Sequence, residues 1–438
     1  MGIRTVSLAL GFGLTALAAT RGSEVTFHKD VLPILQKRCQ GCHRPGEIGP
    51  MSLLSYQEAR PWAKAIREAV LTKKMPPWFA DPQHGKFEND RSLAQPDIDT
   101  LAAWAEAGAR EGDPSHAPKA AEFTEGWQIG KPDAILELPN EFEVPATGTI
   151  DYQFIVVPTG FTEDKWIEKV ETRPGARSVV HHVVVFAREP GSPWLKNAKP
   201  GVPLPSPPQK RKPQEDTGVG AFWAAPGVEV LATYVPGGIP YLLKPGQGRL
   251  IKAGSDLVFQ MHYTSSGKAA ADRSRIGLVF AKEPVRERVR NTFVWNPRLR
   301  IPPGAPNHRV DARVTLHETA SLLSLFPHMH VRGKGFEYRA IYPTGETEVL
   351  LSVPKYNFNW QLTYYLERPR VLPKGTRLEC TAYYDNSPNN PHNPDPAAEV
   401  LWGDQTWEEM LAGFMDLAID ASMNPDDLIR PKPAPKAD

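Results

Sequence analysis

The stretch that decides the fold of this chain is Val179-Val180-His181-His182-Val183-Val184-Val185-Phe186. β-Branched and aromatic residues favour strands, and a run this rich in them predicts one. It also holds two adjacent histidines, and neighbouring side chains of a regular strand point to opposite faces. Both imidazoles could therefore reach one metal ion only at a strand end or at a bulge.

Strand-like segments recur through the rest of the chain. The 45 prolines and 34 glycines, with little helical periodicity after the first quarter, favour many short strands joined by turns. Such spacing is typical of antiparallel sandwiches. We therefore expect two all-β, jelly-roll-like sandwiches over 126–286 and 287–430, and a surface excursion in the proline- and lysine-rich stretch 188–214. Strand candidates run over 150–157, 166–172, 178–186, 257–264, 321–330, 336–342 and 377–384.

Residues 24–113 follow a different pattern, with three helix-like segments at 30–38, 56–72 and 96–109. In the last of these, apolar residues recur with helical spacing and form a stripe on one face. Asp30 is the expected N-cap of the first helix, and Pro33 is confined to its first turn. The sequence predicts a small all-α domain, followed by a linker at 114–125 that is rich in alanine, proline and lysine.

Length and charge limit the function classes. A chain of 438 residues exceeds what one hydrophobic core usually supports, so we expect three domains. The 51 lysine and arginine residues nearly match the 50 acidic ones. This balance gives no electrostatic reason to expect a nucleic-acid or anionic-membrane partner.

The N-terminus predicts export. Residues 1–19 carry one basic residue, Arg4, and then an apolar run from Val6 to Ala19 that is too short for a spanning helix. We interpret this segment as a cleavable signal peptide, which implies a periplasmic or secreted protein. No later stretch approaches the roughly 18 apolar residues of a membrane span, so we expect no integral membrane segment in the mature chain.

The segment Cys39-Gln40-Gly41-Cys42-His43 matches the C-x-x-C-H pattern of covalent haem attachment. In that pattern two thioether bonds fix the porphyrin, and the histidine becomes an axial iron ligand. A redox or zinc-binding C-x-x-C pair is the alternative, which the adjacent His43 disfavours. Met75 is the expected second axial ligand, as in the small cytochromes c that this segment resembles, and Met51 is its rival. The head is thus expected to be a cytochrome c domain with one haem c.

Two further segments place histidines at spacings that suit metal ligation. Gln260, His262 and Thr264 alternate onto one face of a predicted strand. In Phe326-Pro327-His328-Met329-His330 the histidines stand two residues apart, so a strand would present both imidazoles on one face, where they can chelate one ion. Each segment also allows a simpler interpretation, in which its histidines are hydrogen-bonded or solvated structural residues.

Taken together, these motifs resemble a known family. The order of a histidine pair, a Gln-x-His-Tyr strand, a His-x-His segment and Glu409-Met410 is similar to the copper type II ascorbate-dependent monooxygenases, which include the peptidylglycine and dopamine hydroxylases. The resemblance implies two coppers per chain. The electron-transfer copper would be held by His181, His182 and His262. The oxygen-activating copper would be held by His328, His330 and Met410. Imidazole suits both oxidation states of copper, and a thioether favours Cu(I).

The chain also departs from this family. The peptide-amidating members hold a substrate carboxylate with an arginine and a tyrosine, at positions where this chain has Phe326 and Phe414. The catecholamine branch usually has an alanine at the first of these positions. The resemblance therefore implies a neutral, apolar or aromatic small-molecule substrate. Family members also form a disulfide where this chain has Cys380 and Leu411, so we expect Cys380 to be a free, buried thiol.

These observations predict a copper-dependent monooxygenase that hydroxylates a C–H bond with O2. The fused haem would reload the coppers in place of, or in addition to, ascorbate, because fusion gives a high effective concentration, and the external donor would be ascorbate or a periplasmic redox protein. The alternative is a non-catalytic haem and copper protein for electron transfer or copper binding. A haem protein with an inert sandwich body would require six suitably ordered ligands to be coincidental.

The haem prediction can be tested by substitution. Cys39→Ser or Cys42→Ser should weaken covalent haem retention, because each removes one thioether. Met75→Ala should leave the haem attached and lower its reduction potential, since a methionine ligand raises it. Haem staining after denaturation and redox titration measure the two effects in protein from a host that matures c-type haem. An unchanged spectrum and potential in Met75→Ala would identify Met51 or another residue as the ligand.

Overall fold

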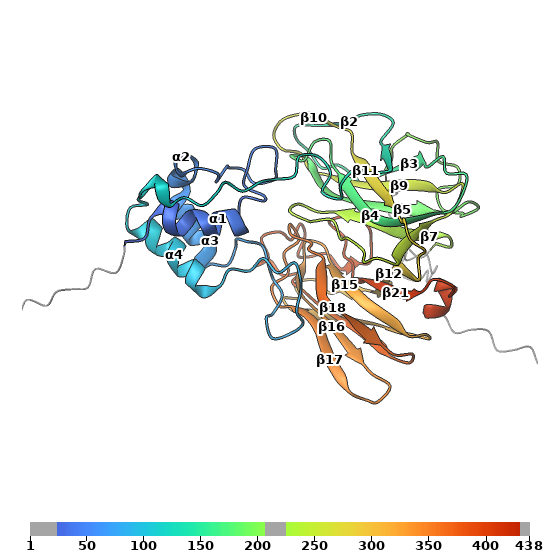
Figure 1. The fold of residues 1–438 in the computed structure, drawn as a ribbon. Coiled ribbons are helices and arrows are strands. Elements are labelled where there is room, and N and C mark those ends of the chain that lie inside the picture. Colours follow the sequence, from blue (N-terminus) through green and yellow to red (C-terminus); the bar gives the residue numbers. More distant parts are fainter. Residues whose placement is uncertain (1–23, 206–224, 430–438) are drawn as a thin grey trace, which may run out of the picture.

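The computed structural model describes residues 24–205 and 225–429, which form a helical head and two β-units (Figure 1). The mainly β body that the sequence predicts is confirmed, with several sheets. All seven strand candidates lie on strands, with bounds shifted by a few residues. The expected signal peptide at 1–19 lies outside the described residues.

The head is built from short helices around its own core. Their bounds are η1 (Phe27–Val31), α1 (Leu32–Arg38), α2 (Tyr56–Ala59), η2 (Arg60–Trp62), α3 (Ala63–Leu71), α4 (Gln95–Glu106) and η3 (Pro114–His116). Phe27, Leu35 and Trp104 are fully buried in this core. Pro33 lies in the first turn of α1 as expected, but Asp30 does not cap that helix. Its carboxylate accepts a hydrogen bond from the backbone N–H of Thr26. The helical segment begins at Phe27, one π-helical turn earlier than the pattern predicts, so Asp30 lies inside that turn.

The first β-unit packs two sheets over one core. A five-stranded sheet has the order β6-β3-β9-β5-β7. Its strands are β3 (Gln153–Pro158), β5 (Val180–Arg188), β6 (Leu204–Pro205), β7 (Val228–Tyr234) and β9 (Asp256–Tyr263). The facing strands are β1 (Ala134–Glu137), β4 (Lys165–Arg173), β8 (Gln247–Ile251) and β11 (Arg275–Phe280), and β2 (Phe142–Val144) pairs with β10 (Ala270–Asp272). Alternate residues of both sheets, such as Val185 and Leu278, form the core between them.

The second β-unit repeats this plan. A four-stranded sheet, β14-β19-β16-β17, consists of β14 (His308–Thr315), β16 (Gly333–Ile341), β17 (Thr347–Val353) and β19 (Arg377–Tyr384). Opposite it lie β12 (Glu287–Trp295), β15 (Ala320–His328), β18 (Tyr364–Leu372) and β21 (Ala412–Asp420). A small pair, β13 (Arg300–Ile301) with β20 (Val400–Leu401), and the turn η5 (Pro425–Leu428) complete the unit. Its core is separate from that of the first unit.

One sheet runs through both units. Eight strands follow the order β1-β11-β4-β8-β12-β21-β15-β18, and the junction is a short parallel pairing between β8 and β12. The expected domain boundary at 286/287 therefore falls at the start of the strand that makes this junction. The two β-units are thus joined edge to edge as well as through the chain.

The proline- and lysine-rich stretch is only partly the surface excursion that the sequence predicts. Trp194 packs edge-on against Phe154 and Phe186, with ring centroids 5.8 and 5.3 Å apart. Residues 188–205 thus cover the outer face of the five-stranded sheet, because this face also carries apolar side chains. Residues 206–214 of the stretch lie outside the described part.

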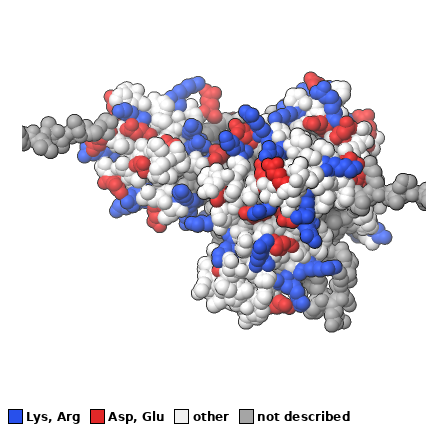
Figure 2. Space-filling model, turned by 90° about the horizontal axis from the view of Figure 1, so that it is seen from below, with Lys and Arg blue, Asp and Glu red and all other residues white. Residues whose placement is uncertain are grey.

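The described surface and helices bear on two partner predictions. Among residues 24–205 and 225–429, no helix is both long enough and apolar enough to cross a bilayer. Basic and acidic side chains are interspersed over the face shown in Figure 2. That mixture agrees with the near balance of charges in the sequence.

Tight packing around Cys380 generates a stability prediction. Cys380 is a free, fully buried thiol, as expected, and a Cβ on Gly413 of β21 would lie 2.4 Å from its sulfur. Gly413→Ala should therefore cost about 1–3 kcal/mol of unfolding free energy through overpacking. In a Cys380→Ala background the same change should cost less, because the clashing sulfur is gone. Urea unfolding of the four proteins measures the coupling, and additive effects would contradict this explanation.

Candidate metal centres

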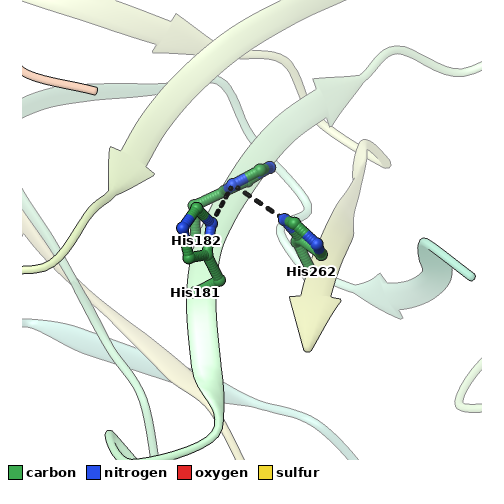
Figure 3. A group of neighbouring side chains, drawn as sticks. All are labelled: His181, His182 and His262. Carbon is green, nitrogen blue, oxygen red and sulfur yellow. Dashed lines mark hydrogen bonds between the residues drawn. The ribbon is translucent and has the colours of Figure 1, made fainter. Parts of the chain in front are cut away.

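The first histidine cluster is assembled by a bulge. Strands β5 and β9 pair Val180 with Tyr263 and then His182 with His262, so the register shifts by one residue and His181 is the extra one. This is one of the two conditions under which adjacent histidines can serve one ion. Figure 3 shows the three imidazoles, two from β5 and one from β9, pointing toward one another.

The distances within this cluster suit a metal ion. Nδ1 of His182 lies 3.3 Å from Nδ1 of His181 and 3.3 Å from Nδ1 of His262. One ligand atom from each residue lies within 4.8 Å of the others. In the part of the chain that the structure describes, this is the one group of three or more histidine, cysteine or acidic side chains at such separations. The predicted set His181, His182 and His262 is thus brought together.

Burial keeps these imidazoles neutral. His182 and His262 are buried against the ring of Tyr152, and His181 stacks on Phe358 with centroids 5.2 Å apart. Desolvation lowers the pKa of His181 to about 4. It holds the pKa of His182 and His262 well below the usual value, and neighbouring histidines add to that effect. A neutral imidazole offers a lone pair to a metal without first losing a proton.

The second cluster differs from the predicted one in its backbone. Strand β15 ends at His328, so His330 lies past the strand end rather than on the same strand face. The two rings nevertheless stay close, with centroids 5.2 Å apart and planes at 88°. The chain turns away because the backbone N–H of His330 donates to the buried carboxylate of Glu409 instead of continuing the sheet.

Each ring of this second cluster is oriented through Nδ1. Nδ1 of His328 lies 2.6 Å from Oε1 of Gln361, and Nδ1 of His330 lies 3.1 Å from the carbonyl oxygen of Glu408. When Nδ1 donates to an oxygen, Nε2 carries the lone pair, which is the usual arrangement of a metal-ligating histidine. Nε2 of His330 is buried and has no hydrogen-bond partner. Burial lowers the pKa of His328 to about 4 and that of His330 to about 3.

Glu409 holds the backbone around Met410. It is fully buried and accepts hydrogen bonds from the backbone N–H groups of His330 and Arg332, at 2.9 and 2.6 Å. Burial raises the pKa of its carboxyl group to about 7, against the opposing effect of these hydrogen bonds. Met410 is 1% exposed and follows directly. The Glu409 carboxylate thus ties the backbone at Met410 to the backbone at His330.

A cavity of about 90 Å³ lies between the two β-units and is lined by residues of both. His182 of the first cluster lines it, and so do all three residues of the second cluster: His328, His330 and Met410. Phe326 and Phe414, the two departures from the amidating enzymes, lie in its wall with ring centroids 5.7 Å apart. The ring of Phe358 stands near both clusters, 5.2 Å from His181 and 6.3 Å from His330.

In the head, Cys39, Cys42 and His43 occupy the turn after α1. Nδ1 of His43 lies 3.3 Å from the carbonyl oxygen of Met51, which leaves Nε2 for another partner. Met51, the rival ligand, is partly buried and packs against the head core. Met75 lies on the loop after α3, and its backbone N–H donates to Ala69. Met75 as the second axial ligand stays a prediction.

The cysteine turn faces the β-units. A Cβ on Gly237 would lie 3.5 Å from Sγ of Cys42 and 3.7 Å from Cζ3 of Trp360, so all three residues meet at one point. Nη1 of Arg91 also donates to the carbonyl oxygen of Gly237, at 2.8 Å. On the other side, Phe87 forms a β-bridge with Leu366 at the edge of the second unit. The head is therefore docked on both β-units by contacts outside the linker at 114–125.

Comparisons with known proteins leave this chain without an assigned family. No protein-family model matches it, and no curated protein does. Capsid structures of infectious bursal disease virus are among the solved structures that match. The structure from the Gx strain is 10% identical in sequence, covers 68% of this chain and 74% of the viral chain, and has a TM-score of 0.18. The VP2 subviral particle is 10% identical over 67% and 72%, with a TM-score of 0.19. Scores this low do not establish a shared fold.

Sequence patterns missed several residues that shape these sites. Phe358 and Gln361 belong to a loop without strand or helix periodicity, so only the fold brings them to the histidines. Tyr152 lies just before β3, and nothing in its local sequence marks it as a neighbour of His262. Glu409 carried a usable signal, because it precedes the predicted methionine ligand.

The depressed histidine pKa values predict a pH dependence for metal-free protein. The unfolded chain binds a proton at His328 near pH 6.5, whereas the folded chain does so only near pH 4. Folding stability should therefore be fully present above pH 6.5 and decline as the pH falls toward 4, by about 1.4 kcal/mol per pH unit for each such histidine. Denaturant unfolding between pH 7 and 4.5 should show a shallower decline in His328→Asn. The exposed control His392→Asn should keep the wild-type slope, and equal slopes in all three proteins would refute this prediction.

Proposed function

We propose that this protein is a copper-dependent monooxygenase that hydroxylates a C–H bond of a small, neutral substrate with O2. The observation that carries the proposal is the convergence of two histidine clusters, from separate β-units, on one cavity. The order of their motifs resembles the copper type II ascorbate-dependent monooxygenases. An enzyme of this kind needs two redox metals and an enclosed space for substrate between them.

The residues present fit copper at the first cluster. Three neutral imidazoles from β5 and β9 give a set of nitrogen donors without a carboxylate, which suits copper better than magnesium or calcium. Phe358 and Tyr152 shield the cluster with aromatic surface. A site closed in this way favours a metal that changes oxidation state without gaining many water ligands. We assign it the electron-transfer role.

The second cluster fits the oxygen-activating role. His328 and His330 supply two imidazoles whose orientation is fixed at Nδ1, and Met410 supplies a soft thioether. That donor set favours Cu(I), and copper in this form would supply the one-electron chemistry that O2 requires. The protein's own contribution is to hold the rings apart at nearly a right angle and to present them to the cavity.

The cavity wall favours an apolar or aromatic substrate body. Phe326 and Phe414 lie beside His328, with centroids 6.1 Å from its ring in each case. Two rings at this place offer apolar contact and no cation for a carboxylate. A peptide with a free C-terminus would leave its charge unpaired here, which costs free energy. We therefore exclude amidation from the proposed activity.

The head fits the proposed c-type haem. His43 is oriented through Nδ1 by a backbone carbonyl, in the manner expected of an axial ligand, and Cys39 and Cys42 stand at the required spacing. Met75 remains the proposed second ligand. Cys42 lies where the head touches Gly237 and Trp360, so a haem attached there would face the copper-bearing units. We propose that electrons from a periplasmic redox protein enter through it and reload the coppers, in place of or in addition to ascorbate.

Substitution of the ligands should empty the two copper sites separately. His181→Ala or His262→Ala should reduce copper from two per chain to one, and His328→Ala, His330→Ala or Met410→Ala should impair the other site, because the clusters share no ligand. Elemental analysis for iron and copper measures this in exported protein, with His392→Ala as control. One substitution that emptied both sites without unfolding the chain would contradict two separate centres.

Oxygen consumption tests the reaction itself. Wild-type protein with one iron and two coppers should consume O2 in proportion to hydroxylated product when a reductant is supplied. Loss of either copper should abolish this coupling while the haem spectrum persists. If the coppers of intact protein are reduced and reoxidised without product, the chain is the non-catalytic electron-transfer or copper-binding protein that the sequence left as the alternative.

A further inference from the structure

The cavity between the β-units also contains a buried ion pair. Arg249 of β8 and Asp416 of β21 line its wall, with Nη2 of Arg249 2.8 Å from Oδ2 of Asp416. Only 7% of Arg249 and 6% of Asp416 is exposed. Neither residue touches the histidine clusters through any contact described above, and the proposed copper chemistry does not use them. Buried charges of this kind require complete pairing, so their remaining bonds are informative.

The carboxylate of Asp416 is paired with three donor groups. Besides Arg249, the Ser324 hydroxyl donates to Oδ2 and Nδ2 of Asn291 donates to Oδ1, both at 3.0 Å. A carboxylate only accepts hydrogen bonds, so the amino group of Asn291 must face it and Oδ1 of Asn291 must face away. The carboxylate therefore fixes the orientation of its neighbours and has no need of a ligand.

Two polar atoms remain without partners, one on each of two side chains that bond to Asp416. Nη1 of Arg249 and Oδ1 of Asn291 are both buried and form no hydrogen bond within the protein. Both residues line the cavity. One of the two atoms is a donor and the other an acceptor, and buried polar groups normally find partners. A group that accepts from Arg249 and donates to Asn291 would satisfy both.

The sheet aligns this polar pair with the proposed oxygen-activating centre. On β15 and β21, His328 lies opposite Ala412, Phe326 opposite Phe414, and Ser324 opposite Asp416. Alternate residues of a strand share one face, so these pairs form three successive rows along the cavity wall. At about 6.6 Å per two residues, the polar row lies roughly 13 Å from the histidine row, with the phenylalanine row between them.

We propose that Arg249 and Asn291 form an anchoring subsite for a terminal hydroxyl group on an elongated substrate. The apolar body of that substrate would lie across Phe326 and Phe414, with its far end at His328. A hydroxyl can accept from Arg249 and donate to Asn291 at once. A carboxylate cannot donate, and it would add a second negative charge near Asp416. The inference deepens the proposed monooxygenase function and rests on it for the identity of the reacting end.

Binding of matched probes to the full chain tests the subsite without turnover. Isothermal titration calorimetry should show that 4-n-butylphenol binds about tenfold or more tightly than n-butylbenzene, because the hydrocarbon leaves both polar atoms unpaired. It should also bind more tightly than 4-n-butylbenzoate. Arg249→Lys retains a cation for Asp416 but loses the second donor arm, so it should reduce the phenol preference severalfold. The matched control is Arg288→Lys, a buried arginine paired with Glu229 at 2.9 Å outside the cavity wall, which should keep that preference.

A second variant covers the case in which Arg249→Lys does not fold. Asn291→Ala removes the acceptor from a less buried residue and should also reduce the phenol preference. Equal binding of phenol and hydrocarbon to wild-type protein, tighter binding of the benzoate, or equal losses in Arg249→Lys and Arg288→Lys would each overturn the proposal. Selective binding in a protein that makes no product would retain the subsite and refute the monooxygenase, whereas turnover without phenol preference would do the reverse.

Discussion

The parallel pairing of β8 with β12 is the interaction on which the site depends. It joins only Gln247 to Glu287 and Gly248 to Arg288, yet it makes one sheet out of two β-units. The Gln247 side chain reinforces it with a 2.9 Å hydrogen bond to Glu287. Gly248 is required there, because a Cβ would lie 2.9 Å from the side chain of Val285.

Two buried ion pairs lie beside this junction. Arg249 follows Gly248 directly and reaches Asp416 on β21, and Arg288 of β12 reaches back to Glu229 on β7. Both arginines are buried, so loss of either partner would leave an uncompensated charge, a change that usually costs about 3–5 kcal/mol. Each pair joins a strand of the first β-unit to a strand of the second, and of the two arginines only Arg249 lines the cavity.

The buried arginines are charged and paired, whereas the buried histidines of the second cluster are kept neutral. Glu409 is the acidic group nearest in sequence to Met410, but its oxygens accept backbone N–H groups rather than the N–H of an imidazole. Nδ1 of His328 and Nδ1 of His330 lie against neutral oxygens, those of Gln361 and of the Glu408 backbone. Because no carboxylate stabilises their protonated forms, desolvation dominates and lowers their pKa. Neutral rings in a nearly apolar wall are suited to a metal that itself brings the charge.

Local sequence predicted the strands that alternate or carry β-branched runs, and it missed those whose burial has another pattern. Strand β21 is buried on both faces from Ala412 to Ala418, so it lacks the alternation of a half-buried strand, and Asp416 interrupts its apolar run. The histidine pair was limited in advance to a bulge or a strand end, but only the register of β5 against β9 decides between these. The position of His330 depends on Glu409, 79 residues away, which no local pattern encodes.

The loop between β17 and β18 links the three parts of the molecule, and this bears on how the head should work. Trp360 meets Cys42 at Gly237, Phe358 stacks on His181, and Gln361 orients His328. Three of the four residues at 358–361 thus approach the head or one of the two clusters. The linker also packs on the head, where Gln36 donates to the carbonyl oxygen of Lys119. Since docking is fixed by these contacts, the reach of the linker does not set the distance between the proposed haem and the histidines. That distance is set by the folded interface between the head and the β-units. The proposed electron transfer would therefore not require the head to diffuse on its tether.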